Sequence, residues 1–178
     1  MIKKFIKGIS LIEIIVYAAV LAIIIGVVAG FCLWLTKSQI KSRAVQEVSD
    51  QANLLVGKVV RETRAAEKVY LSTSVFNSDA GQLSLLVKKY LPVGEESSYL
   101  DFFICQNALC LKKEGQDPMA LSSASVDIKK FKIVMVKTGA RDSLEITFEV
   151  SYDNPGNRGE KTASVTVVST VSLRNYQQ

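Results

Sequence analysis

Residues 7–35 read KGISLIEIIVYAAVLAIIIGVVAGFCLWL, where a lysine and a glycine lead into a long apolar run that holds one acid, Glu13. No charged side chain lies between Ile14 and Leu35. At a rise of about 1.5 Å per residue, this run forms a helix long enough to cross a hydrocarbon core of ~30 Å. An ionised carboxylate at the bilayer entrance costs about 2.5 kcal/mol or more unless it lies shallow or has a partner. We therefore predict a membrane-inserting helix whose acid serves a specific purpose.

The order of residues at the start of this run, KGISLIE at positions 7–13, resembles the class III signal of type IV prepilins and pseudopilins. In that family a membrane peptidase cuts after the glycine, and the new amino-terminal residue is usually N-methylated. The resemblance implies cleavage between Gly8 and Ile9, N-methylation of Ile9 and an assembly role for Glu13. Ile9 stands where phenylalanine or methionine is commoner in the family, and Ser10 where threonine is commoner.

The composition argues against an enzyme and against a strongly basic protein. The 178 residues carry a formal net charge of +5, and loss of Lys3, Lys4 and Lys7 with the predicted leader, residues 1–8, lowers it to +2. The chain contains no histidine. This rules out Ser-His and Cys-His catalytic pairs and removes the commonest zinc ligand. We expect no catalytic residues, no metal site and no cofactor.

The helix is predicted to continue beyond the apolar run. The composition turns polar at Thr36, yet no proline or cluster of turn residues interrupts the helical pattern. Apolar residues recur every three or four positions and form a stripe: Ala44 or Val45, Val48, Ala52, Leu55, Val59 and Ala66. Polar residues flank this stripe, among them Glu47, Asp50, Lys58, Arg61 and Glu62. One helix is therefore expected from residue 9 to about 68, apolar over 9–35 and amphipathic over 36–68. The stripe fades too early for a long heptad coiled coil, which is the alternative.

Residues 69–178 show short β-type runs separated by turn residues. Residues 69–75 suit either a helix end or an edge strand. The strands that the pattern predicts are 82–90, 99–105, 108–113, 131–137, 143–152 and 162–173, and the last two alternate clearly between apolar and polar side chains. The predicted fold class is α+β, with one long amino-terminal helix packed on an antiparallel sheet, which is the pilin-like architecture that the resemblance implies.

Two of the three cysteines, Cys105 and Cys110, are close enough in sequence to share a hairpin. If Asn107 and Ala108 are the central turn residues, Cys105 lies opposite Cys110 in a non-hydrogen-bonded pair whose Cα atoms are ~4.5 Å apart. That separation suits a disulfide, and a location outside the cytoplasm would favour oxidation. Two reduced cysteines on one buried face are the alternative.

Two sets of polar residues bear on further binding functions. The lysines of 88–89, 112–113 and 129–132 would suit a phosphate backbone, but lysines are also common on the solvated edges of strands, so DNA has only weak support as a partner. The oxygen-rich residues 153–157, DNPGN, would suit calcium, but Asn-Pro-Gly is explained equally well by a turn. We predict neither site.

The resemblance implies a structural subunit of a type IV pilus-like filament. Its partners would be a prepilin peptidase, other pilin or pseudopilin subunits, and an assembly platform in the inner or cytoplasmic membrane. The leader would face the cytoplasm and residues 69–178 would lie outside, first on a single-pass membrane protein and later on a cell-surface or periplasmic filament. Major pilins often close a longer carboxy-terminal loop with a disulfide, which is lacking here. The chain is therefore more similar to a minor pilin or to a J-type pseudopilin of type II secretion.

Two other classes of protein stay open. A signal-anchored bitopic membrane protein with an extracytoplasmic, ligand- or partner-binding β domain would carry the same helix, and its leader would not be removed. A membrane-tethered enzyme would need a pocket in the β domain that gathers Asp, Glu or Ser side chains.

Overall fold

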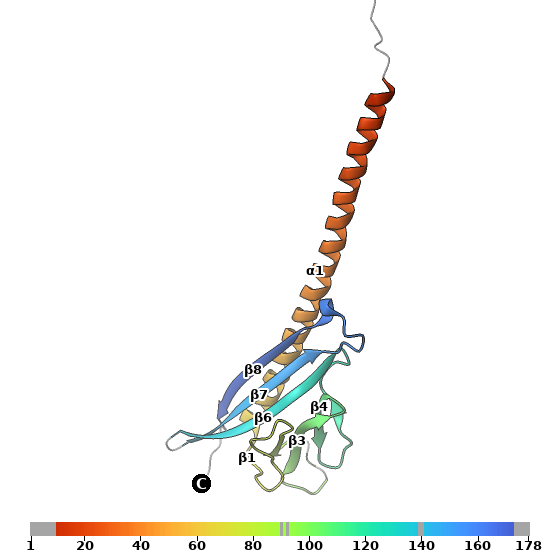
Figure 1. Ribbon diagram of the computed structural model, residues 1–178. Helices are drawn as coiled ribbons and strands as arrows, with labels where there is room; N and C mark the ends of the chain where they lie inside the picture. The colour runs from red at the N-terminus through yellow and green to blue at the C-terminus, as the bar shows by residue number, and fades with distance from the viewer. Residues whose placement is uncertain (1–9, 90, 92, 139–140, 173–178) are drawn as a thin grey trace, which may run out of the picture. The chain divides into compact units, whose positions relative to one another are not determined.

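The protein is described by a computed structural model of residues 10–89, 91, 93–138 and 141–172 (Figure 1). This described part contains one α-helix, eight β-strands and one short 3-10 helix. The chain divides into two compact units, residues 1–40 and residues 41–178. Because the helix passes from the first unit into the second, its two halves are described separately.

The first unit contains the amino-terminal half of the helix α1 (Leu11–Ala65). The carbonyl oxygen of Ser10 accepts hydrogen bonds from the backbone N–H groups of Glu13 and Ile14, at 3.0 and 3.3 Å, and so starts the helix. Every side chain from residue 10 to residue 39 is exposed. Thr36 Oγ1 donates to the carbonyl oxygen of Cys32 at 2.6 Å, so the first polar side chain after the apolar run is satisfied within the helix.

The second unit contains the amphipathic half of α1, which buries one face. Its buried apolar residues are Ala44, Val48, Ala52, Leu55, Val56 and Val59. The predicted stripe is therefore confirmed, with Ala44 rather than Val45 facing the core. The helix ends at Ala65, three residues before the expected boundary, and Ala66 is buried directly after it. Glu62, expected on the polar flank, is instead only 4% exposed.

Two antiparallel sheets complete the second unit. The first has the strand order β1-β2-β3-β4-β5, and its strands are β1 (Lys68–Val69), β2 (Gln82–Val87), β3 (Ser98–Cys105), β4 (Ala108–Lys113) and β5 (Met119–Ala120). The second has the order β6-β7-β8, with β6 (Val126–Thr138), β7 (Arg141–Tyr152) and β8 (Ser164–Ser172), and a 3-10 helix, Gly159–Lys161, precedes β8. The α+β prediction is confirmed, while the strands form two sheets instead of the single sheet expected.

The two sheets are joined by a loop rather than by a shared strand pair. The N–H of Phe131 in β6 donates to the carbonyl oxygen of Asp79, and the N–H of Gly81 donates back to the carbonyl oxygen of Phe131, both at 2.8 Å. Gly81 is required here, because a Cβ at this position would lie 2.6 Å from that same carbonyl oxygen. The loop before β2 therefore occupies the edge of β6 that a continuous sheet would need.

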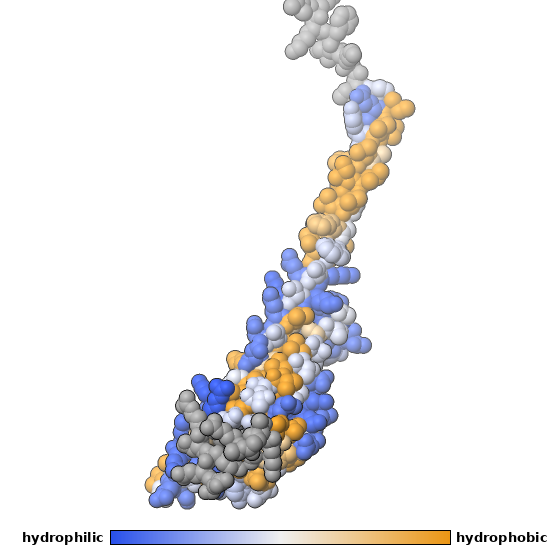
Figure 2. All heavy atoms as spheres, turned by 90° about the vertical axis from the view of Figure 1, so that its left-hand side faces the viewer, coloured by the Kyte–Doolittle hydropathy of each residue, from blue (hydrophilic) through white to orange (hydrophobic). Residues whose placement is uncertain are grey.

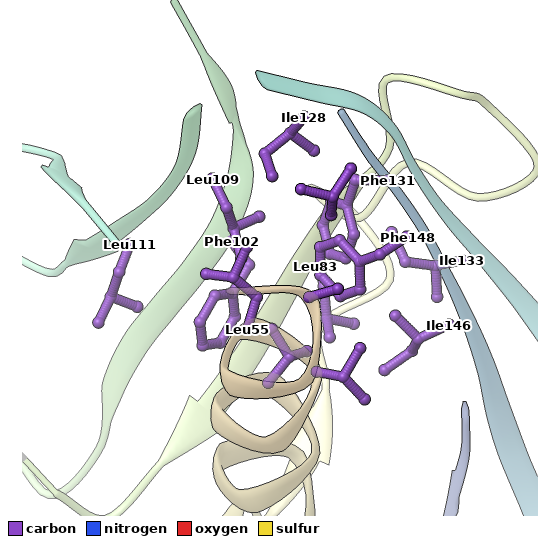
Figure 3. Close-up of a cluster of buried hydrophobic side chains, with 14 of the residues drawn as sticks. Leu55, Leu83, Phe102, Leu109, Leu111, Ile128, Phe131, Ile133, Ile146 and Phe148 are labelled. Carbon is purple, nitrogen blue, oxygen red and sulfur yellow. The ribbon is translucent and has the colours of Figure 1, made fainter. Parts of the chain in front are cut away.

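The core lies where α1 meets both sheets (Figure 3). Leu55 of the helix lies among Leu83 and Phe102 of the first sheet and Ile146 and Phe148 of the second, and all five are buried. The rings of Phe131 and Phe148 stack within the second sheet, with centroids 4.8 Å apart. Burying apolar side chains from three layers in one cluster is the main stabilising term of this unit.

Truncation of Leu55 tests this packing. Leu55 is fully buried, whereas its neighbour Leu54 is 57% exposed. We expect Leu55→Ala to lower the free energy of unfolding by about 2–5 kcal/mol, because it removes buried carbon and leaves a cavity. The matched control Leu54→Ala is expected to change it by about 0.5 kcal/mol or less. Urea unfolding of the full chain in detergent micelles, followed by near-UV circular dichroism, measures both; equal losses would contradict the helix face described.

Candidate functional site: the exposed amino-terminal helix

The surface of α1 from Leu11 to Leu35 is apolar and uncovered. The aliphatic and aromatic side chains in this stretch are exposed, and Figure 2 shows hydrophobic residues along the face of this half of the helix that is in view. By length and composition the helix can cross a membrane. Apolar surface of this extent is unfavourable in water at roughly 25 cal/mol per Å². This half of the helix therefore requires lipid or other protein around it.

Glu13 is the acid in the first turn of α1. The Tyr17 hydroxyl donates a hydrogen bond to Glu13 Oε1 at 3.1 Å. The two residues are one helical turn apart, at the i,i+4 spacing that brings side chains together, so the sequence contained this signal although Tyr17 was not predicted as a partner. A neutral hydroxyl satisfies part of the carboxylate without adding positive charge. Glu13 is thus oriented within the chain, and no ion pair to it is found among the described residues.

The other predicted residues of this site, Gly8 and Ile9, lie outside the described residues. Leader cleavage between them and methylation of Ile9 stay predictions. The described residues contribute the helix that begins at Leu11 and the acid in its first turn.

Cys105 and Cys110 are joined by a disulfide in the structure, with Cα atoms 5.8 Å apart. The expected register is wrong: Cys105 lies opposite Ala108, and Cys110 lies opposite Phe103. The central turn residues are Gln106 and Asn107, with φ angles of 48° and 63°. A two-residue turn of this kind requires positive φ at both positions. The disulfide is therefore diagonal across the hairpin, between residues that share one face.

A hollow of about 380 Å³ lies beside the oxygen-rich turn 153–157, where β7 ends and β8 begins. Its lining includes Asp127, Asp153 and Asn154. The Asn154 side chain accepts from the Arg158 N–H at 3.1 Å and donates to the Arg158 carbonyl oxygen at 2.9 Å. Asp127 binds Lys129 at 2.9 Å. Within the described residues no three Cys, Asp or Glu side chains gather as metal ligands, and the hydrogen bonds of Asn154 are those of a turn.

The lysines weighed as a phosphate-binding surface are partly engaged in ion pairs. Lys88 lies 3.6 Å from Glu67, and Lys130 lies 3.3 Å from Asp79. With Lys129 bound to Asp127, each of the three has a carboxylate beside it. Interspersed charges of both signs give a weaker attraction for a polyanion than a continuous basic patch would.

No protein-family model matches the sequence, and no curated protein matches it either. Among solved structures, a type IV-like pilin from Thermus thermophilus is similar to the chain with a TM-score of 0.49 and 13% sequence identity. The alignment covers 71% of this chain and 96% of that one. Both measures of similarity are low, so the function proposed for this chain rests on its own residues.

The state of the cysteines can be checked directly. We expect alkylation of the denatured, unreduced chain to label Cys32 alone, and alkylation after reduction to label all three cysteines. The unreduced protein should also be lighter by the mass of two hydrogens. In the control variant Cys32→Ala, no label should attach before reduction. Labelling of Cys105 or Cys110 in the unreduced chain would show that the pair is a dithiol.

Proposed function

We propose that this chain is a structural subunit of a type IV pilus-like filament. The observation that carries the proposal is the uncovered apolar surface of α1 between Leu11 and Leu35. The prepilin-like residues 7–13 lead into this stretch of the sequence. The core of the folded unit begins only at Ala44. The same helix surface can therefore contact lipid in the precursor and neighbouring subunits in the filament without any change in the domain it carries.

In this proposal, a prepilin peptidase removes residues 1–8 between Gly8 and Ile9, and the new amino group of Ile9 is methylated. The precursor is a single-pass membrane protein with its leader in the cytoplasm and its β domain outside. An assembly platform in the inner or cytoplasmic membrane transfers it into a filament at the cell surface or in the periplasm. The position of the acid, five residues after the cut when Ile9 is counted as the first, is the family feature on which the assignment depends.

Glu13 is the assembly residue in this proposal. When the helix leaves lipid for a bundle of other apolar helices, its carboxylate enters a medium of low dielectric constant, where an unpaired charge costs several kcal/mol. Tyr17 stabilises the carboxylate by a hydrogen bond of 3.1 Å but adds no positive charge. The amino group of Ile9 on a neighbouring subunit is a cation that can reach it. The pair would fix the axial position of one subunit against the next.

Within the family, the features described above are more similar to those of a minor pilin or a J-type pseudopilin of type II secretion than to those of a major pilin. The cysteine pair spans a tight hairpin, with a sequence separation of 5. A major pilin more often closes a long carboxy-terminal loop. We place DNA binding outside the proposal, because Lys88, Lys129 and Lys130 have carboxylates beside them.

The alternative is a signal-anchored bitopic membrane protein whose β domain binds a ligand or partner outside the cytoplasm. It shares the membrane helix and the disulfide, and it requires neither processing nor a role for Glu13. The observation that supports this alternative is that α1 is long and apolar enough to cross a membrane. The two proposals differ in the fate of residues 1–8.

Leader removal is tested by co-expression with a prepilin peptidase and intact-mass measurement of the purified chain. We expect the measured mass to be that of residues 9–178 plus one methyl group, carried by Ile9. Replacement of Gly8 by a bulky residue should block the cut, while Ser10→Thr, which moves toward the commoner family residue, should leave it unchanged. An uncut wild-type chain in the presence of an active peptidase would favour the bitopic alternative.

The role of Glu13 is tested by Glu13→Ala. We expect the variant to insert into the membrane normally, because the apolar run is unchanged. We expect it to lose incorporation into filaments, because removing one partner of a buried ion pair destabilises the assembly by about 3–5 kcal/mol. Asp50→Ala is the matched control, since Asp50 is an exposed acid on the same helix. Carbonate extraction measures insertion, and recovery in sheared filament fractions measures assembly. Normal assembly of Glu13→Ala would refute the proposed pairing.

A further inference from the structure

Among the described residues, the strand β8 presents a long sheet edge that pairs with no other strand. It pairs with β7 along its whole length, from Ser164 opposite Ser151 to Ser172 opposite Ser143. On its other side, no backbone hydrogen bond is made by any described residue. Figure 1 shows β8 at the margin of the second sheet. Since every second residue of an edge strand directs its N–H and C=O groups outward, β8 offers a row of free donors and acceptors.

The other edges of the two sheets are protected. The edge strands β1 and β5 of the first sheet have two residues each. In the second sheet, the outer edge of β6 is hydrogen-bonded through Phe131 to the loop that contains Asp79 and Gly81. That strand also carries Lys129, Lys130 and Lys132. Short strands, covering loops and lysines are the means by which proteins prevent edge-to-edge pairing. Of the described edges, β8 is the one to which none of these applies.

The sequence of β8 is suited to pairing with itself. It reads SVTVVSTVS, without charge, proline or glycine. Read backwards it is SVTSVVTVS, so the strand is a near palindrome in which only Val167 and Ser169 change places. In an antiparallel pair centred on Val168, serine lies opposite serine at the ends, and Thr166 lies opposite Thr170 of the other copy. Like residues meet without any pair of like charges.

We propose that β8 pairs antiparallel with β8 of a second copy of this chain, so that the two β6-β7-β8 sheets continue as one across a two-fold axis at Val168. The register keeps the faces of the sheet matched. Along β8, exposed side chains alternate with partly or fully buried ones, and the exposed row is Ser164, Thr166, Val168, Thr170 and Ser172. Centring on Val168 sets this row against the same row of the partner. A slip of one residue would set the exposed row against the packed row of the other copy, and the faces of the two sheets would no longer match.

Val168 is the apolar centre of this surface. It is 55% exposed in the single chain, whereas Val171 in the same strand is 2% exposed. Pairing covers Val168 with its own copy and satisfies the outward backbone groups, which are the two contributions that stabilise added strands. The pairing uses only the unit of residues 41–178, and filament assembly uses residues 11–35. Failure of either proposal therefore leaves the other standing.

Cysteine cross-linking of the full chain in detergent micelles tests the register. The background variant is Cys32→Ala, so that the added cysteine is the free thiol, with Cys105 and Cys110 bonded to each other. In the proposed pair the two Val168 Cα atoms are about 4.5–5.5 Å apart, within the range of a disulfide. Mild oxidation of Val168→Cys should therefore give a covalent dimer on a non-reducing gel.

The matched control is Thr166→Cys, which lies on the same exposed row. Its Cα is about 14 Å from its own copy across the two-fold axis, too far for a disulfide. Thr166→Cys alone should therefore give no covalent dimer on the non-reducing gel, and a mixture with Thr170→Cys carrying a longer tag should give the mixed covalent dimer. Absence of dimers from Val168→Cys, or equal yields from Val168→Cys and Thr166→Cys alone, would overturn the proposal.

A second variant tests the pairing without oxidation. Val168→Lys places two like charges opposite each other at the axis, while the exposed position leaves the fold intact. Light scattering corrected for detergent should show loss of the dimer in Val168→Lys and its retention in Val168→Thr, which keeps the β-branched shape. A chain that is monomeric before substitution, or a Val168→Lys variant that stays dimeric, would show that β8 of a second copy is not the partner.

Discussion

The structure depends on one packing constraint, the contact of a single helical face with two sheets. Val48, Leu55 and Val59 of α1 are fully buried, and the buried faces of both sheets belong to the same core cluster. Neither sheet alone could bury its apolar face, because each has only one side against the helix and needs that contact to exclude water. The helix therefore acts as the central element of the folded unit. It is also the element whose other half has no core to join.

The features that the sequence predicted correctly are those whose periodicity extends over many residues. The apolar stripe of α1 repeats every three or four positions over more than twenty residues, and this spacing is enough to tell which face of the helix is buried. The alternation of β7 is equally clear, since Leu144, Ile146, Phe148 and Val150 are all buried. Such patterns average over many side chains, so one exception does not change the result. At the candidate site, the same kind of signal identified the apolar run and its acid.

The features that the sequence did not predict depend on single residues or on distant parts of the chain. The β3–β4 turn is centred on Gln106 and Asn107, one residue earlier than the expected Asn107 and Ala108. Asn tolerates a positive φ better than Ala does, and this preference argues against Ala108 as a central turn residue. The separation into two sheets depends on Gly81 approaching β6 from a loop far away in sequence. Glu62 shows the limit of predicting exposure from a polar side chain. It is buried, its Oε2 has no hydrogen-bond partner among the described residues, and its other oxygen lies 3.8 Å from the Arg61 guanidinium.

The core is separate from the apolar run, and this bears on how the proposed filament subunit would move from lipid into protein. No residue before Ala44 belongs to the buried core of the described chain. Exchange of lipid for protein around residues 11–35 therefore breaks no contact of the core and exposes none of its apolar surface. The free energy of that exchange is determined by the helix alone: its packing against other helices, which is comparable in lipid and in a bundle, and the charge of Glu13, which is not. A hydrogen bond from Tyr17 in the same helix is kept in both environments and cancels from the difference. In the proposed filament, the term that remains is the cation that Glu13 would meet only in the assembly, and this one acid would then determine whether the long apolar helix stays in the membrane or leaves it.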